Sequence, residues 1–248
     1  MIFWNSFRPM AAAKALAAIF FALLTVTAAS AQSLSVVPVN VFLPPGQKAT
    51  SLTVINQGTT ETAIQIRAYL WNQKDNVDQL TNTGDVALSP PITKIAPGAT
   101  QVIRLILRAT PEGREATYRI LIDQIPPPAE PGVVHMVLRF SIPIFVQPAG
   151  RTFPDVQFHL ERDGEQIYLV GFNAGNLHEK IREIVLVTND GRKFKAESGK
   201  SPYVLSGATR RWQIAAQDSL PLTSETMQLT AQADAGAIDQ QVRFVAAK

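Results

Sequence analysis

The chain has 248 residues, 17 prolines, no cysteine and a formal net charge of only +3. So small a charge provides no basic surface for nucleic acid, and without cysteine no disulfide can stabilise the fold. The length is sufficient for two domains of ordinary size, each with its own core.

The first predicted element is a cleavable signal peptide covering Met1 to Ala31. Arg8 and Lys14 provide a positive start, Ala15 to Val26 is an apolar run, and Ala29-Ser30-Ala31 is a small-x-small cleavage site. The apolar run is short for a bilayer span, so cleavage is favoured over the alternative of a retained anchor. An exported chain without cysteine is typical of a bacterial periplasmic protein.

Residues 32–148 are predicted to form a first domain, an all-β sandwich of about seven strands. Short apolar or alternating runs recur there between turn residues, and no run of twelve residues has a helical period. The expected strands lie within Ser33 to Leu43, Thr50 to Asn56, Ala63 to Trp71, Pro90 to Gly98, Thr100 to Leu107, Thr117 to Ile125 and Val133 to Phe145.

The last of these stretches has an unbroken apolar row on one face. With a period of two, the row consists of Val134, Met136, Leu138, Phe140 and Ile142. The pattern of this stretch alone favours a buried core strand. The alternative is an apolar edge that is kept open for another polypeptide, and that interpretation depends on the rest of the chain.

Residues 149–248 are predicted to form a second, smaller β-sandwich after a hinge at Gln147-Pro148-Ala149-Gly150. Short strand-like runs continue to the end of the chain, and Asp190-Gly191 between two apolar runs is a strong hairpin signal. We therefore expect an all-β protein of two sandwich domains.

The sequence contains no recognisable catalytic or cofactor motif. His135, His159 and His178 lack metal-ligand spacing, no G-x-S-x-G motif occurs, and Gly171 and Gly175 fit no phosphate-binding loop. We expect no enzymatic activity, no metal or other cofactor, and no small-molecule substrate.

Several motifs of the first domain, taken in order, resemble those of the periplasmic pilus chaperones of the chaperone–usher pathway. They are Pro90-Pro91, Ile95-Ala96-Pro97-Gly98, Val102-Ile103-Arg104-Leu105, the run from Glu115 to Pro127, and Ile142-Pro143-Ile144-Phe145-Val146-Gln147-Pro148. The resemblance implies two Ig-like β-sandwiches joined at an angle by a short hinge.

The resemblance also implies a function in fimbrium biogenesis and cell wall organization. Such a chaperone works without ATP, donates a β-strand to incomplete Ig-like pilus subunits, and delivers them to an outer-membrane usher. The alternative is a structural pilus subunit or surface adhesin built of Ig-like domains, because Leu34 to Val39 alternates in part like a free extension.

In the chaperone interpretation the donated side chains are those of Val134, Met136, Leu138, Phe140 and Ile142. Alternate side chains of a donated strand fill the groove of the subunit, and its main chain supplies hydrogen bonds. An open apolar edge is an aggregation hazard, so we expect self-association or an ordered loop when no client is bound.

Two further sites are implied, each with a departure from the family pattern. In the family, two cations bind the C-terminal carboxylate of the client subunit. Asn40 and Pro143 stand at those two positions here, which leaves Arg119 and Arg139 as candidate anchors. We favour Arg119 over a third arginine, Arg104, although Arg119 also fits a solvated strand position. The motifs around Tyr118-Arg119 and Ile142 to Phe145 are similar to the archaic branch of the family.

The second implied site is an ion pair that braces the hinge between the domains. Glu115 matches the acidic member of that pair, but Gln147 stands where the basic member is usual. Arg151 is the candidate substitute.

Overall fold

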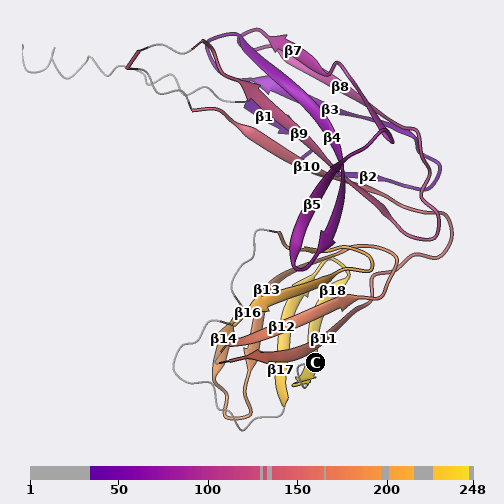
Figure 1. Cartoon of the computed structure of the whole chain (residues 1–248), viewed down its shortest axis with the longest axis vertical. Coiled ribbons are helices and arrows are strands. Elements are labelled where there is room, and N and C mark those ends of the chain that lie inside the picture. Colours follow the sequence, from indigo (N-terminus) through magenta and orange to yellow (C-terminus); the bar gives the residue numbers. More distant parts are fainter. Residues whose placement is uncertain are drawn as a thin grey trace, which may run out of the picture.

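The computed structural model describes residues 34–128, 131–132, 136–164, 166–196, 201–214 and 226–245. It shows two β-sandwich domains at an angle to each other (Figure 1). The described part contains no helix, and therefore none that could cross a membrane. The fold class expected from the sequence is confirmed. The predicted signal peptide, Met1 to Ala31, lies outside the described residues.

The first domain is built from two sheets packed face to face. One sheet has the order β1-β3-β8-β6, and the other has the order β2-β10-β9-β4-β5 with β7 paired to β4. These strands are β1 (Leu34–Val37), β2 (Val41–Leu43), β3 (Ala49–Asn56), β4 (Thr62–Lys74), β5 (Val77–Asn82), β6 (Val86–Ser89), β7 (Ile92–Ile95), β8 (Thr100–Leu107), β9 (Ala116–Ile125) and β10 (Arg139–Val146).

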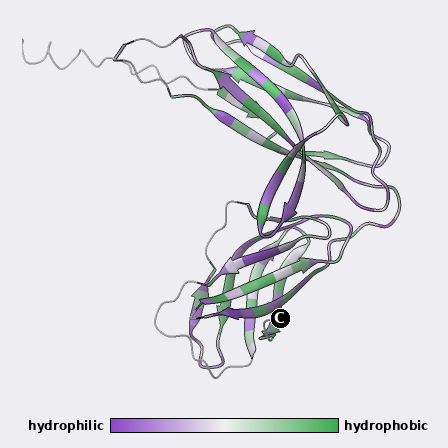
Figure 2. Ribbon diagram, viewed as in Figure 1, coloured by the Kyte–Doolittle hydropathy of each residue, from purple (hydrophilic) through white to green (hydrophobic). Residues whose placement is uncertain are grey.

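Alternation along the strands creates the core of this domain (Figure 2). In β8, for example, Ile103, Leu105 and Leu107 are buried, whereas Val102 and Ile106 are exposed. A pleated strand directs successive side chains to opposite faces, so one face of each sheet is enclosed between the layers. Each fully buried aliphatic side chain contributes about 1.5–3 kcal/mol to the stability of this core.

The expected first strand, Ser33 to Leu43, is divided between the two sheets. Strand β1 pairs antiparallel with β3, whereas β2 pairs parallel with β10 at the edge of the other sheet. Pro38 lies between them and has no N–H to donate to a ladder, so an interruption there is physically reasonable. The crossing places β2 beside the last residues of β10, Ile144 to Val146.

The second domain has a three-stranded sheet, β11-β12-β16, and a five-stranded sheet in which β15 pairs with β13 beside the path β14-β13-β17-β18. Thr188 to Arg192 forms the predicted turn between β13 and β14. The strands are β11 (Val156–Asp163), β12 (Gln166–Asn173), β13 (Glu179–Val187), β14 (Lys193–Lys195), β15 (Tyr203–Val204), β16 (Thr209–Gln213), β17 (Thr226–Ala233) and β18 (Gly236–Arg243).

Candidate functional site

Strand β10 lies at an open margin of the first domain. It pairs with β9 over its whole length, but β2 covers its other side only at Ile144, Phe145 and Val146. Among the described residues, the part of β10 from Arg139 to Pro143 therefore has a ladder on one side only. A half-paired strand of this kind can accept an additional strand.

The apolar row of this region passes from the core into solvent. Ile142 is 4% exposed, Leu138 is 36% exposed and Met136 is 85% exposed, while Phe140 between them packs partly against the core. Leu138 still contacts the neighbouring strand, because its carbonyl accepts the N–H of Gln124 at 2.9 Å. Beyond the covered part of the sandwich, large apolar side chains thus remain available.

Two details of the predicted donor row require correction. Ile142 was expected among the donated side chains, but it belongs to the buried core of its own domain and cannot enter a foreign groove without unpacking. The strand also begins at Arg139 and not at Val133, so Met136 and Leu138 precede it. Val134 lies outside the described residues.

Arg119 lies between the two domains on β9, directly opposite Pro143. Its guanidinium carbon is 3.7 Å from the ring centre of Trp71 in the first domain and 5.8 Å from that of Tyr203 in the second. Burial lowers the pKa of Arg119, and the charges of Asp78 and Tyr203 oppose that shift. Within the described part of the chain no carboxylate forms an ion pair with it.

Arg139, the other candidate anchor, already has a partner. It forms an ion pair with Asp123, which also accepts a hydrogen bond from Arg67 at 2.6 Å. Burial tends to raise the pKa of Asp123, but the hydrogen bonds from Arg139 and Arg67 outweigh burial and lower it. Arg104 is exposed on β8, in the opposite sheet. Of these three cations, only Arg119 is both between the domains and without a carboxylate partner among the described residues.

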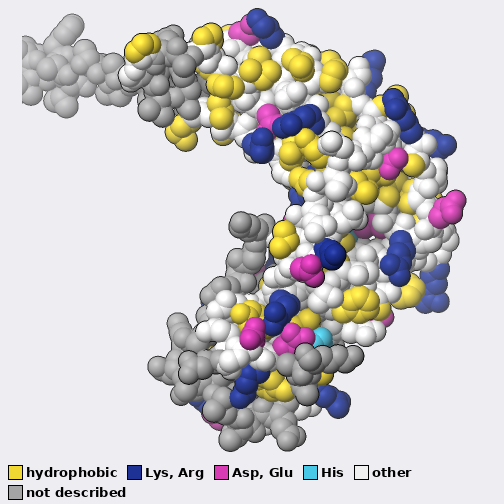
Figure 3. Space-filling model, viewed as in Figure 1, with side chains coloured by type: hydrophobic (Ala, Val, Ile, Leu, Met, Phe, Trp, Pro, Cys, Tyr) yellow, Lys and Arg dark blue, Asp and Glu magenta, His cyan; other side chains and the backbone are white. Residues whose placement is uncertain are grey.

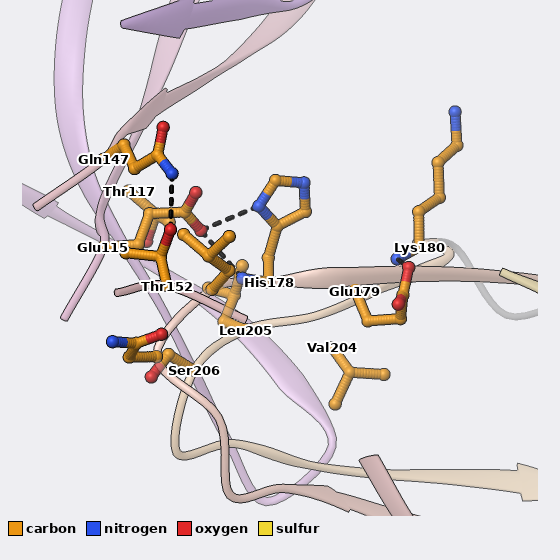
Figure 4. Close-up of polar contacts among 12 residues, drawn as sticks. Glu115, Thr117, Gln147, Thr152, His178, Glu179, Lys180, Val204, Leu205 and Ser206 are labelled. Atoms are coloured by element: carbon orange, nitrogen blue, oxygen red, sulfur yellow. Dashed lines mark hydrogen bonds and ion pairs between the residues drawn. The ribbon is translucent and has the colours of Figure 1, made fainter. Parts of the chain in front are cut away.

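Glu115 contacts the second domain, but through a residue that the sequence did not indicate (Figure 4). Its carboxylate accepts the backbone N–H of His178 at 2.9 Å and lies 2.7 Å from Nδ1 of the same residue. An ionised carboxylate only accepts, so Nδ1 carries the proton here. The expectation that Arg151 supplies the partner is wrong: its backbone carbonyl accepts a hydrogen bond from Asn176, and Gln147 bonds to Thr152.

Around this contact the domains share a cluster of rings, the interdomain aromatic cluster, formed by Phe42, Trp71, Phe145, His178 and Tyr203. The His178 ring stacks on Phe145 with centroids 3.5 Å apart, and Trp71 meets Tyr203 edge-on at 5.6 Å. Offset and edge-on contacts are the favoured geometries for such rings. Trp71, Phe145 and Tyr203 are buried between the domains, so their packing favours the observed angle.

The hairpin between β4 and β5 is a second connection between the domains. The side-chain amide of Asn76 donates to the carbonyl of Arg211 at 3.1 Å and accepts the N–H of Arg211 at 2.9 Å. Gln73 makes the same two-way contact with the chain around Tyr203 and Leu205, at 2.9 and 3.0 Å. Asn76 has φ of 64°, a left-handed conformation that asparagine tolerates well. We call this set of hydrogen bonds the hairpin clasp.

These features define a class of protein. Two β-sandwiches are held at a fixed angle, an apolar strand at the margin of the first is half-paired, and a cation lies between the domains, where the molecule is hollowed (Figure 3). This combination is suited to binding an extended polypeptide along β10.

Residues 33–152 match the family model described as pili and flagellar-assembly chaperone, PapD N-terminal domain. The match covers the first domain, which resembles this chaperone family.

Individual relatives and solved structures agree with this family. The chaperone protein FimB/FhaD of Bordetella pertussis is 26% identical over 134 residues, which are 49% of this chain and 53% of that protein. The chaperone protein PapD of Escherichia coli is 30% identical over 34% of this chain and 36% of its own. The chain thus spans about half, or less, of the length of these relatives.

Among solved structures, the fold is similar to that of the CsuC–CsuE chaperone–tip adhesion subunit pre-assembly complex from archaic Csu pili of Acinetobacter baumannii. The TM-score is 0.63 at 22% identity, over 87% of this chain and 100% of the other. The YadV chaperone has a TM-score of 0.60 at 16% identity, over 85% and 98% of the two chains. Both comparisons extend across the two domains, so the fold as a whole is that of these chaperones.

Proposed function

We propose that this protein is an ATP-independent periplasmic chaperone that lends a β-strand to incomplete Ig-like pilus subunits and delivers them to an outer-membrane usher. The observation that carries the proposal is the half-paired margin of β10 with its apolar row extending out of the core. The match of the first domain to the chaperone family supports it, and so does the CsuC–CsuE complex, in which a chaperone of the same fold is bound to a pilus subunit.

The donated segment is the start of β10 together with the residues before it. Met136 and Leu138 enter the open groove of the subunit, Phe140 lies at the boundary, and Val134 continues the row. The main chain from Arg139 to Pro143 bonds to the exposed strand of the client, which covers both unpaired edges at once. Without a client, the same segment promotes self-association.

Arg119 anchors the terminal carboxylate of the client. A carboxylate in a partly dry cleft needs a cation and hydrogen-bond donors, and the guanidinium supplies both in a planar arrangement. Stacking on Trp71 holds that plane in place between the domains. Arg139 is excluded from this role by its pairing with Asp123.

A pilus subunit or adhesin is the less suitable alternative. A subunit that polymerises presents a free N-terminal extension, whereas Leu34 to Val37 are paired with β3 inside the first domain. The protein acts in the periplasm, to which the signal peptide Met1 to Ala31 directs it. It works by binding alone, without catalysis or a cofactor.

The proposal is tested by the subunits that the protein retains in the periplasm of its source organism. The tagged chaperone is purified and its bound proteins are identified by mass spectrometry; Leu138→Glu and Met136→Glu are expected to abolish recovery of Ig-like subunits. Val102→Glu is the matched control, because Val102 is 46% exposed on β8, in the other sheet. Equal subunit recovery with the two donor-row variants and the control would refute the proposal.

A further inference from the structure

The second domain also directs a cation toward the region between the domains. His178, Glu179 and Lys180 are consecutive at the start of β13, where side chains alternate between the two faces. Figure 4 shows His178 and Lys180 on one side of the strand and Glu179 on the other. Because His178 reaches Glu115 of the first domain, Lys180 lies on the side that faces that domain.

Lys180 and Arg119 are neighbours of the same aromatic ring. The ammonium nitrogen of Lys180 is 5.6 Å from the ring centre of Tyr203, and the guanidinium carbon of Arg119 is 5.8 Å from it. Tyr203 pairs with Lys180 in the short ladder between β15 and β13. One cation from each domain therefore stands beside a ring that belongs to the interdomain aromatic cluster.

The acidic groups nearby are all engaged elsewhere. Asp78 forms an ion pair with Arg210 at 3.5 Å, and Asp234 forms one with Arg182 at 3.0 Å. The carboxylate of Glu179 points to the other side and accepts the backbone N–H groups of Lys180 and Asp234.

Among the residues that the structure describes, neither Lys180 nor Arg119 has a carboxylate within ion-pair distance. Asp78 acts on Arg119 only from beyond ion-pair distance. Two like charges beside one ring, neither of them in an ion pair within the described residues, form a site that favours an anion.

We propose that Lys180 and Arg119 together hold the terminal carboxylate of the client, so that each domain supplies one cation of the anchor. This inference rests on the proposed chaperone function and adds a specific residue of the second domain to it. The two cations have different roles. Arg119 is fixed by stacking on Trp71, whereas Lys180 has a flexible four-carbon stem and can follow the position of the ligand.

A two-domain anchor makes client binding depend on the angle between the domains. If the domains separated, the two cations would no longer reach one carboxylate. The hairpin clasp and the Glu115–His178 contact thus keep the anchor assembled before the client arrives, which reduces the ordering that binding requires.

The proposal is tested with two acetylated peptides of sequence Ile-Thr-Ile-Thr, one ending in a free carboxylate and one in an amide. Binding to the full-length mature protein is followed by NMR titration. We expect the carboxylate peptide to bind more tightly than the amide, and Lys180→Met to remove this preference by weakening carboxylate binding about tenfold, as for loss of one charge-assisted hydrogen bond.

Three controls separate loss of the anchor charge from general effects of substitution. Lys180→Arg is expected to restore most of the preference, and Lys193→Met, at an exposed position of β14, is expected to leave it unchanged. Thermal unfolding shows whether each variant is folded, and Lys180→Gln replaces Lys180→Met if that variant is not.

A preference for the carboxylate peptide that persists in Lys180→Met but is lost in Arg119→Ala would overturn the two-domain anchor while leaving the proposed function intact. No preference in the unaltered protein would overturn it as well. Failure of the chaperone function itself is recognised separately, by subunit recovery that is insensitive to Leu138→Glu.

Discussion

The two ends of the apolar row on β10 differ in exposure although their chemistry is the same. Ile142 and Ile144 are 4% and 0% exposed in the core of the first domain, whereas Leu138 and Met136 are 36% and 85% exposed. The difference coincides with the start of β10 at Arg139: Ile142 and Ile144 lie within the strand that pairs with β9, whereas Leu138 and Met136 precede it. One continuous row is therefore core at one end and open surface at the other.

A donor surface can therefore form where an apolar row continues beyond the part that the domain covers. The buried half is held in register against β9 from Arg139 to Val146, and the exposed residues of the row precede this ladder. A client that completes its own sandwich on this row meets side chains whose spacing is already set. Four predictions test the difference in exposure along this row and the anchor site between the domains.

The largest difference in stability is expected between two variants, one substituted at the buried end of the apolar row and one at its exposed end. Ile144→Ala removes a fully buried side chain and should lower the free energy of unfolding by about 2–5 kcal/mol. Leu138→Ala should lower it by a smaller amount, about 1 kcal/mol, because a side chain that is 36% exposed has less cover to lose. Urea unfolding measures both. Similar losses in the two variants would show that the exposed end also belongs to the core.

Removal of the first anchor cation should weaken client binding by about 2 kcal/mol or more, since the bound carboxylate would lose a partner in a partly dry cleft. The variant is Arg119→Ala, and the affinity for a purified client subunit is the quantity to measure. Arg104→Ala is the control, because that side chain is exposed on the opposite sheet. If Arg104→Ala weakened binding as much, the anchor would lie elsewhere.

The hairpin clasp should contribute a smaller amount to the association of the domains. Asn76→Ala removes two hydrogen bonds to Arg211, and we expect a loss of about 1–3 kcal/mol in the stability of the domain interface. Small-angle scattering would then show a wider range of domain angles, and client affinity would fall with it. Asn82→Ala, at an exposed position of β5, should have no such effect; an unaltered scattering profile for Asn76→Ala would show that the aromatic cluster alone sets the angle.

The smallest effect concerns Arg139, which is exposed at the open end but paired with Asp123. Arg139→Ala should destabilise the fold by less than about 1 kcal/mol, because solvent screens such a pair. The pKa of Asp123 is lower in the folded chain than its ordinary value of 3.8, so the pairs stabilise the fold above that value.

This stabilisation is lost as the pH falls through the lower, folded pKa of Asp123. The difference in unfolding free energy between the unaltered protein and Arg139→Ala should therefore shrink between neutral pH and about pH 2. A difference that is constant over this range would mean that Asp123 does not carry it. Client affinity should not change, since Arg139 is already neutralised by Asp123.

Much of the fold follows from local pattern. Alternation placed Ile103, Leu105 and Leu107 on one face of β8, and the structure buries them together. The face of β10 that carries Phe140 and Ile142 was also identified correctly from its period of two. These features depend only on where successive side chains point along a strand, which the order of residues determines.

The errors of the sequence analysis have a common origin. Ile142 was assigned to the donor row because nothing local to β10 shows how far along the row the core of the first domain extends. Arg151 was chosen as the partner of Glu115 because it lies near Gln147, the usual position of the basic residue, whereas His178 is brought there by the packing of the second domain. Lys180 was not considered at all, since its position beside Tyr203 depends on the pairing of β13 with β15.

The amino-acid sequence by itself determined the strands, the face that each strand buries and the resemblance to the pilus chaperones. Only the tertiary structure decided which part of the apolar row remains open, which residues join the domains and which cations stand beside Tyr203. The physical reason is that a side chain's direction along a strand is a local property, whereas its exposure and its partners are set by segments far away in the chain.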